Sequence, residues 1–224
     1  MERNHFVRPR FIAPMLCRQI QTLPRGDDWF YEVKHDGHRA LAVKDGAKVT
    51  LFSRDGKRLD YPEVRDVVRQ LDAARAVIDC EIIALDKMGK SCPAALRSNR
   101  GDCTIRLYAF DLLHLNGRDL TSEPIERRKD RLCTITLDTA VIFSPSLDCE
   151  PDMLIEQVKQ LSLGGIIAKR RGSTYEAGKR GGAWVSLLLN GDGHGANLRR
   201  NGGPPACIHR RHEGSFRRAR KGRL

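Results

Sequence analysis

Short apolar segments joined by Asp-Gly dipeptides dominate the region from residue 29 to residue 53. Three such segments, WFYEVK, HRALAVK and AKVTLFS, are connected at Asp36-Gly37 and at Asp45-Gly46. Asp-Gly favours the tight turn of a β-hairpin. The pattern therefore predicts an antiparallel meander of three strands.

Helical periodicity follows this region. Four apolar residues after Pro62 are spaced as on one face of a helix: Val64, Val67, Val68 and Leu71. Proline is well tolerated in the first turn of a helix, so Pro62 is expected near its start. Two further helices are predicted at residues 125–132 and 152–161.

Longer apolar runs predict the remaining strands. VIDCEIIAL at residues 77–85 is almost continuously apolar, as expected of a buried strand. IRLYAFDLLHL at residues 105–115 ends at Asn116-Gly117, and GGIIAKR at residues 164–170 is the last strong strand. Strands separated irregularly by helices favour an α+β fold of mainly antiparallel sheets over a doubly wound parallel sheet.

The composition changes near the C-terminus. Residues 190–224 contain seven glycines, two adjacent prolines, nine basic residues and two acidic residues, and have almost no aliphatic periodicity. Such a segment buries too little apolar surface to offset the entropy lost on ordering. The sequence therefore predicts a domain at residues 1–189 and a disordered basic tail at residues 190–224.

The overall charge is +12, from 40 Lys and Arg against 28 Asp and Glu. This excess suits a phosphate-rich partner such as nucleic acid, although a solvated basic surface has the same composition. Seven scattered cysteines without a CxxC pair argue against a zinc ribbon or a disulfide framework. No apolar stretch approaches 18 residues, so we expect no contact with membranes and a cytoplasmic location.

Several charged residues lie in unusual places. Lys34 lies two positions before Asp-Gly, where it is either the rim of a hairpin or a nucleophile. Glu81 and Asp111 interrupt apolar runs, which is costly unless each carboxylate meets a cation, a metal or a ligand hydroxyl. A structural salt bridge with Arg39 or Arg54 is the alternative for either carboxylate.

Six segments in order resemble the motifs of ATP-dependent DNA ligases, in the covalent nucleotidyltransferase superfamily. They are EVKHDGHR (32–39), SRDG (53–56), DCEII (79–83), LYAFDLLHLNG (107–117), GGIIAKR (164–170) and AWV near Trp184. The resemblance covers about Phe11 to Leu189 and is closest to bacterial ligases of end-joining repair. It implies an ATP-grasp-like nucleotidyltransferase domain.

The resemblance also implies a reaction. Lys34 would attack the α-phosphorus of ATP and form a lysyl-AMP intermediate, with Mg²⁺ offsetting charge on the transferred groups. Arg39 and Arg54 match family positions that hold the AMP phosphate or the nick phosphate. Nicked double-stranded DNA would be the substrate, other end-joining repair proteins would be partners, and the location would be the bacterial cytoplasm, near the nucleoid.

Four more residues match nucleotide-binding positions of the family. Glu32 lies where the family reads the adenine through a side chain or the backbone. Glu81 would accept hydrogen bonds from the ribose hydroxyls, and Phe110 would stack on the adenine, although core packing alone also explains a phenylalanine there. Lys169, on the fourth-motif strand, would be a cation of the same ATP site.

Three positions depart from the family pattern. Gly164 stands where a metal-binding glutamate is expected, and Ser186 and Leu188 stand where two phosphate-binding lysines are expected. The metal ligands are therefore unknown. An OB-fold domain would begin near Asn190, where the basic tail stands instead. These departures predict a ligase catalytic domain impaired by a damaged or truncated C-terminus.

Two alternatives remain at this level. An RNA ligase or a capping-type nucleotidyltransferase shares the KxDG motif around Lys34. A non-catalytic remnant would only bind nucleic acid, through its positive charge.

Overall fold

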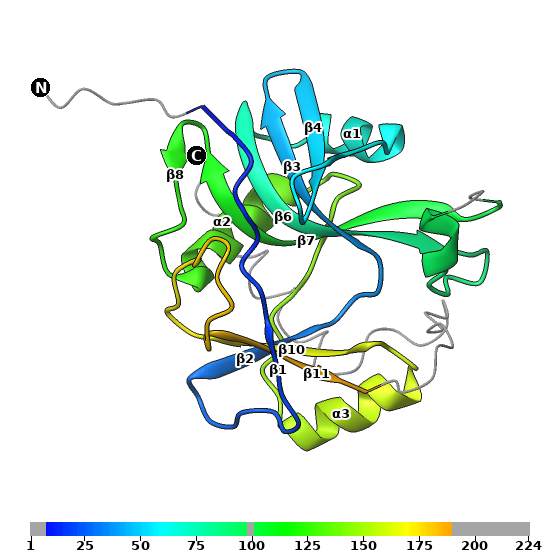
Figure 1. Cartoon of the computed structure of the whole chain (residues 1–224), viewed down its shortest axis with the longest axis vertical. Helices are drawn as coiled ribbons and strands as arrows, with labels where there is room; N and C mark the ends of the chain where they lie inside the picture. The colour runs from blue at the N-terminus through cyan, green and yellow to red at the C-terminus, as the bar shows by residue number, and fades with distance from the viewer. Residues whose placement is uncertain (1–7, 98–100, 190–224) are drawn as a thin grey trace, which may run out of the picture.

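The computed structural model describes residues 8–97 and 101–189 (Figure 1). The predicted tail at residues 190–224 lies outside the described residues, and the division into residues 1–189 and 190–224 stays a prediction. The elements in chain order are β1 (Arg18–Gln19), β2 (Trp29–Val33), β3 (His38–Asp45), β4 (Lys48–Ser53), β5 (Arg58–Leu59), α1 (Pro62–Arg69), β6 (Arg75–Leu85), the 3₁₀ helix η1 (Pro93–Leu96), β7 (Thr104–Leu115), β8 (Arg118–Asp119), α2 (Ile125–Thr136), β9 (Ile142–Phe143), α3 (Pro151–Gln160), β10 (Gly165–Arg170) and β11 (Trp184–Leu188).

The strands form two sheets. The larger sheet has the order β5-β4-β3-β6-β7-β8, with β9 parallel to β7, and the smaller sheet has the order β1-β11-β10-β2, with β1 parallel to β11. All other pairs are antiparallel, so the predicted α+β fold of mainly antiparallel sheets is confirmed. Helices α1 and α2 cover the larger sheet, and α3 covers the smaller one (Figure 1).

Alternating residues of the larger sheet separate two cores. On β3, Ala40 and Ala42 face the core under α1 and α2, whereas Leu41 and Val43 join a second core with Trp184 of the smaller sheet. Successive side chains of a strand point to opposite faces. Both faces of β3 are therefore buried, and one of them faces the other sheet.

The predicted three-stranded meander is wrong at its first turn. Strand β2 pairs with β10 in the smaller sheet, whereas β3 pairs with β4 and β6 in the larger one. Asp36-Gly37 therefore lies in a crossing between the sheets. A Cβ on Gly37 would lie 2.1 Å from the carbonyl oxygen of Ile82, so glycine is required here by close approach of two backbones. The hairpin at Asp45-Gly46 is confirmed, with Gly46 at φ +61°.

The other predicted elements are present, with shifted ends. Strands β6, β7 and β10 match the three apolar runs, and Asn116-Gly117 has the positive φ angles of a tight turn. Helix α2 runs four residues further than expected, to Thr136, and α1 ends at Arg69, before Leu71. Strand β11 begins at Trp184 and was not predicted. Within the described residues, every cysteine is free and no helix is long and apolar enough to cross a membrane.

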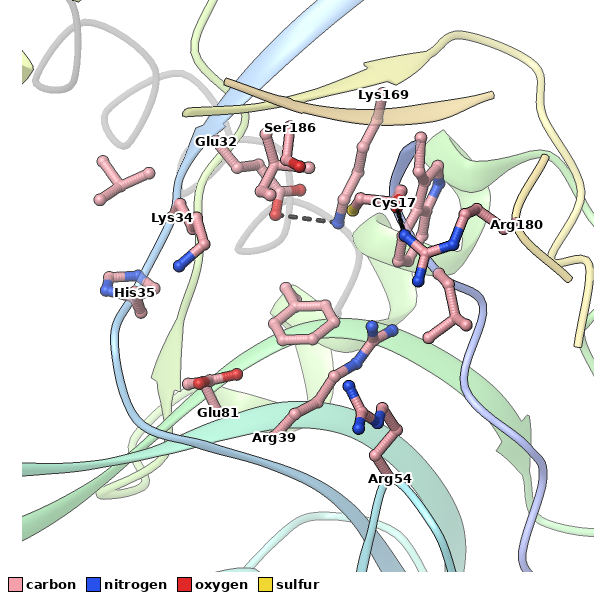
Figure 2. A pocket seen from close by; sticks show the side chains of 15 residues that line it. Cys17, Glu32, Lys34, His35, Arg39, Arg54, Glu81, Lys169, Arg180 and Ser186 are labelled. Carbon is pink, nitrogen blue, oxygen red and sulfur yellow. Dashed lines mark hydrogen bonds and ion pairs between the residues drawn. The ribbon is translucent and has the colours of Figure 1, made fainter. Parts of the chain in front are cut away.

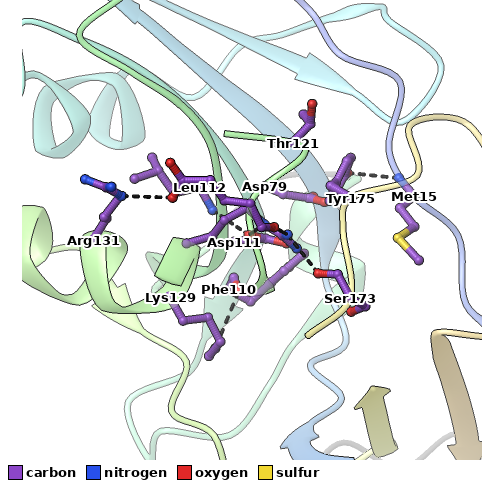
Figure 3. Close-up of polar contacts among 12 residues, drawn as sticks. Met15, Asp79, Phe110, Asp111, Leu112, Thr121, Lys129, Arg131, Ser173 and Tyr175 are labelled. Atoms are coloured by element: carbon purple, nitrogen blue, oxygen red, sulfur yellow. Dashed lines mark hydrogen bonds and ion pairs between the residues drawn. The ribbon is translucent and has the colours of Figure 1, made fainter. Parts of the chain in front are cut away.

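Asp111 has a different partner from those considered. Its carboxylate accepts two hydrogen bonds from Arg128 of α2, at 2.8 Å and 2.9 Å, and both side chains are fully buried. Arg128 also donates to the carbonyl oxygen of Ser173, close to Asp111 in Figure 3. The predicted partners Arg39 and Arg54 are therefore wrong for Asp111, because the helix that follows β7 brings its own arginine over the sheet.

Removing one member of this buried pair is expected to destabilise the fold strongly. Asp111→Ala leaves the Arg128 guanidinium without its counter-ion, so the free energy of unfolding should fall by about 3–5 kcal/mol. The matched control is Asp66→Ala, which removes an exposed ion pair with Arg69 and should cost less than about 1 kcal/mol. Urea denaturation measures both, and equal losses would contradict a structural role for the buried pair.

Candidate active site

A pocket of about 270 Å³ opens between the two sheets (Figure 2). The smaller sheet and the crossing after it contribute Glu32, Lys34 and Lys169, and the larger sheet contributes the opposite side. All seven residues predicted from the sequence line it: Glu32, Lys34, Arg39, Arg54, Glu81, Phe110 and Lys169. The structure thus brings the predicted set together, while the role of each member stays a prediction.

Lys34 lies at the start of the crossing. Its backbone N–H donates to the carbonyl oxygen of Gly165 at 3.0 Å, which continues the pairing of β2 with β10. Its ammonium group donates to Oδ1 of Asp36 at 2.7 Å. The side chain of Lys34 is 29% exposed, so its amine is accessible from the pocket.

Glu32 is buried with two lysines. Its Oε1 lies 2.6 Å from Nζ of Lys129, and its Oε2 lies 2.9 Å from Nζ of Lys169. Burial raises the pKa of Glu32, but the two ammonium groups outweigh burial and hold this pKa below its usual value. Both carboxylate oxygens are thus engaged. The predicted contact of Glu32 with adenine stays a prediction.

Lys169 lies among aromatic rings. Its Nζ is 4.2 Å from the ring centroid of Trp184 and 4.9 Å from that of Phe110. Such cation–π contacts are favourable for a desolvated ammonium group. Phe110 is partly buried and lines the pocket, so its ring is available to a ligand as well as to the core.

Arg39 is held by Asp79. Its Nε and Nη2 donate to the two carboxylate oxygens at 3.0 Å and 2.7 Å, and Nη2 also donates to the carbonyl oxygen of Met15 at 2.7 Å. Tyr175 donates to Asp79 at 2.6 Å (Figure 3). Burial lowers the pKa of Arg39, but Asp79 outweighs it and raises this pKa. Arg39 therefore pairs with Asp79 and not with Glu81.

Arg54 differs from the other predicted residues because it is exposed. Its side chain is 63% exposed and pairs only loosely with Asp55, at 3.4 Å. Arg54 thus lies at the rim of the pocket, where its guanidinium can turn toward a ligand.

Glu81 has no lysine or arginine partner among the ion pairs of the described residues. Its Oε1 accepts a hydrogen bond from the backbone N–H of Gly37 at 3.0 Å. Burial raises the pKa of Glu81 to about 7. His35, which lines the same pocket, is affected in the opposite sense, since burial lowers its pKa to about 4.

The three departures from the family pattern fall in different surroundings. Ser186 is buried, lines the pocket and pairs with Ile167 of the adjacent strand β10. Leu188 is 46% exposed at the end of β11. Gly164 precedes β10 and brings no carboxylate. Within residues 8–97 and 101–189, no three His, Cys, Asp or Glu side chains gather as a metal site.

Sequence reasoning missed three groups that shape the site: Asp36, Asp79 and Lys129. Lys129 carried a readable signal, because Ile125 and Leu132 place it on the apolar face of a helix, where an unpaired charge is costly. Asp79 was visible only as the first residue of the DCEII motif. Asp36 was assigned to a turn, which concealed its contact with Lys34.

The raised pKa of Glu81 predicts how stability changes with pH. Unfolded Glu81 titrates near 4.5 and folded Glu81 near 7, so the folded protein binds more protons between these values. Its contribution to the free energy of unfolding should therefore fall by about 1–3 kcal/mol as pH rises from about 5 to about 8. Glu81→Gln removes this contribution, while His35 titrates in both proteins. Urea denaturation of the unaltered protein and of Glu81→Gln between about pH 5 and about pH 8 checks this prediction. The same pH dependence of the free energy of unfolding in both proteins would contradict it.

Comparisons with known proteins agree with this geometry. The family model for the ATP dependent DNA ligase domain matches residues 14–187. The multifunctional non-homologous end joining protein LigD of Mycobacterium bovis is 30% identical over 177 residues, covering 78% of this chain and 23% of the relative. LigD of Pseudomonas aeruginosa is 32% identical, covering 80% of this chain and 22% of the relative. The chain thus spans about a quarter of these relatives.

Solved structures show the same fold. A mycobacterial DNA ligase D complexed with ATP and MES has a TM-score of 0.72 and 30% identity, with 79% of this chain and 60% of that chain covered. The predicted nucleotidyltransferase fold is thereby confirmed. Because the family model covers more than half of the sequence, this chain belongs to the family of ATP-dependent DNA ligase domains.

Proposed function

We propose that this chain is the catalytic domain of an ATP-dependent DNA ligase that acts through a lysyl-AMP intermediate. The observation that carries the proposal is the position of Lys34, whose amine lies on the crossing between two sheets and faces a pocket lined by the predicted nucleotide-binding residues. A nucleophile in such a place can reach a ligand held by both sheets at once.

The pocket offers different groups to each part of ATP. We assign the adenine to the aromatic side, where the ring of Phe110 is available for stacking. The carboxyl group of Glu81 is placed to accept from the ribose hydroxyls. Arg39, Arg54 and Lys169 supply positive charge for the phosphates.

Mg²⁺ fits this site only as an ion that arrives with ATP. Mg²⁺ is usually held by one or two carboxylates together with substrate phosphates and waters. The carboxylate of Asp36 accepts a hydrogen bond from Lys34, and the carboxyl group of Glu81 lines the same pocket. These two groups meet the requirement for one or two carboxylates, although position 164 brings none. When bound, Mg²⁺ would offset negative charge on the phosphates.

Lys34 performs the first step. Its ammonium group gives one proton to solvent, and the neutral amine attacks the α-phosphorus. A phosphoramidate N–P bond forms, the nitrogen releases a second proton to solvent, and pyrophosphate leaves with the electrons of the broken P–O bond. The rings of Phe110 and Trp184 exclude water from one side of this site. Transfer of AMP to a DNA 5′-phosphate and attack by the adjacent 3′-hydroxyl would complete sealing.

Nicked double-stranded DNA is the proposed substrate, and end-joining repair in the bacterial cytoplasm is the proposed setting. The LigD relatives are named for non-homologous end joining, and the charge of +12 suits a phosphate backbone. Other end-joining repair proteins are the proposed partners. Sealing of nicked DNA but not of nicked RNA would separate this function from that of an RNA ligase, and DNA binding without lysyl-AMP would identify a non-catalytic remnant.

Lys34 is predicted to be the residue that carries AMP. Incubation with ATP labelled in the α-phosphate should leave label on the denatured chain, whereas γ-labelled ATP should not. Lys34→Ala should abolish the label because the nucleophile is gone. The control Lys48→Ala removes an exposed lysine at the start of β4 and should keep full labelling. Label that persists in Lys34→Ala would defeat the assignment.

Phe110 is predicted to contribute to ATP binding beyond its share of the core. Phe110→Leu keeps most of the apolar volume but loses the stacking face, so ATP affinity should fall by about 3- to 10-fold. Phe143→Leu is the matched control, since Phe143 is also partly buried but lies outside the pocket. Equilibrium binding of ATP and thermal unfolding are measured on both variants. Equal ATP affinities would make Phe110 a core residue only.

A further inference from the structure

Two cysteines outside the pocket lie in contact where β6 ends and β7 begins. The thiols of Cys92 and Cys103 share a hydrogen bond. Both cysteines are free and only partly buried, whereas Cys80 is fully buried in the core. Cys92 and Cys103 are therefore accessible to small reagents in solution.

The backbone after β6 brings Cys92 to this place. The chain turns back at the end of the strand, and Ser91 pairs with Leu85 as an isolated bridge. The N–H of Cys92 then donates to the carbonyl oxygen of Ala84 at 2.8 Å. Cys92 is consequently fixed beside the last residues of β6.

Cys103 reaches the same place from β7. It directly precedes Thr104, the first residue of β7, which pairs with Leu85 of β6. Its neighbour Asp102 forms an ion pair with Lys87 of the turn after β6, at 2.5 Å. An exposed ion pair such as this one adds little stability. Its position nevertheless shows that the segment before β7 meets the segment after β6.

We propose that Cys92 and Cys103 form a reversible disulfide bond when the chain meets a peroxide, and that the folded chain accommodates this bond. Thiols that share a hydrogen bond need only small side-chain rotations to reach the geometry of a disulfide. The scattered spacing of the cysteines in the sequence conceals this pair, because the fold brings its members together. The bond does not depend on the proposed ligase function.

The reaction has two balanced steps. One thiol takes an oxygen atom from hydrogen peroxide and becomes a sulfenic acid, while the reduced peroxide leaves as water. The second sulfur attacks the sulfenic sulfur, an S–S bond forms, and the sulfenic oxygen leaves as water with the proton of the second thiol. Two thiols thus give two electrons and two protons to one peroxide, which becomes two water molecules.

The surroundings of the two thiols set the order of these steps. Partial burial raises the pKa of the Cys92 thiol, and the Cys103 thiol and Asp86 raise it further. The thiolate is the form that attacks a peroxide, so Cys92 is disfavoured in the first step. Cys103 is therefore oxidised first, and Cys92 completes the disulfide.

The bond is tested by treating the full, reduced chain with hydrogen peroxide, alkylating the remaining thiols and digesting with trypsin without reductant. Trypsin cuts after Arg97, so Cys92 and Cys103 fall on different peptides. Mass spectrometry should find these two peptides joined, with a mass two hydrogen atoms below their sum, and dithiothreitol should separate them. Peptides that stay unlinked, or a link from either cysteine to another one, would overturn the inference.

Serine variants identify the thiols and their order. Cys92→Ser and Cys103→Ser should each abolish the linked peptides, whereas the control Cys133→Ser, on α2, should keep them. Dimedone, which labels sulfenic acids, should label Cys103 in Cys92→Ser about 3- to 10-fold more than it labels Cys92 in Cys103→Ser. Equal labelling would contradict the assigned order.

Thermal unfolding tests whether the folded chain accommodates the bond. A disulfide restricts the unfolded chain, so the Tm of the peroxide-treated chain should lie about 2–8 °C above that of the reduced chain. Cys133→Ser should show the same rise and Cys103→Ser none, which separates the effect of the bond from other oxidation. An unchanged or lower Tm of the linked chain would mean that the bond distorts the fold, and would overturn this part of the inference.

Discussion

The site depends on the two ion pairs that the carboxylate of Glu32 forms with Lys129 and Lys169. Glu32 on β2 and Lys169 on β10 belong to the smaller sheet, whereas Lys129 belongs to α2, which packs on β7 of the larger sheet. Three buried charges are tolerable only when they satisfy one another. Lys129 also donates to the carbonyl oxygen of Ser144 at 2.7 Å, which fixes it in one orientation. This cluster ties the two sheets together beside the pocket and holds Lys169 against the aromatic rings.

The second constraint is the crossing of the chain between the sheets. Close approach of Gly37 to Ile82 anchors the end of the crossing, and pairing of Lys34 with Gly165 anchors its start. Lys34 therefore has a fixed backbone at the boundary of the pocket, while its side chain is free to change partners. A nucleophile that must meet a nucleotide held by both sheets is well placed there.

Much of the fold and the site could be predicted from the sequence, for identifiable reasons. Strands β6 and β7 are long apolar runs, and the ordered motifs named seven residues that all line the pocket. The prediction of a hairpin at Asp36-Gly37 was wrong because turn propensity is a local property. Strand β2 instead pairs with β10, more than 130 residues later. The predicted ion-pair partners of Asp111 and Arg39 were wrong for a related reason. The packing of strands and helices decides which charged side chains form ion pairs, and the periodicity of the sequence alone does not reveal these pairs.

The central claim is that this pocket holds ATP so that Lys34 becomes adenylated. The most direct measurement is a crystal structure of the chain after incubation with ATP and Mg²⁺. The account predicts electron density for AMP bonded to Nζ of Lys34, with the adenine against Phe110 and the ribose beside Glu81. AMP bonded to another residue, or ATP bound outside the pocket with Lys34 still paired to Asp36, would contradict it.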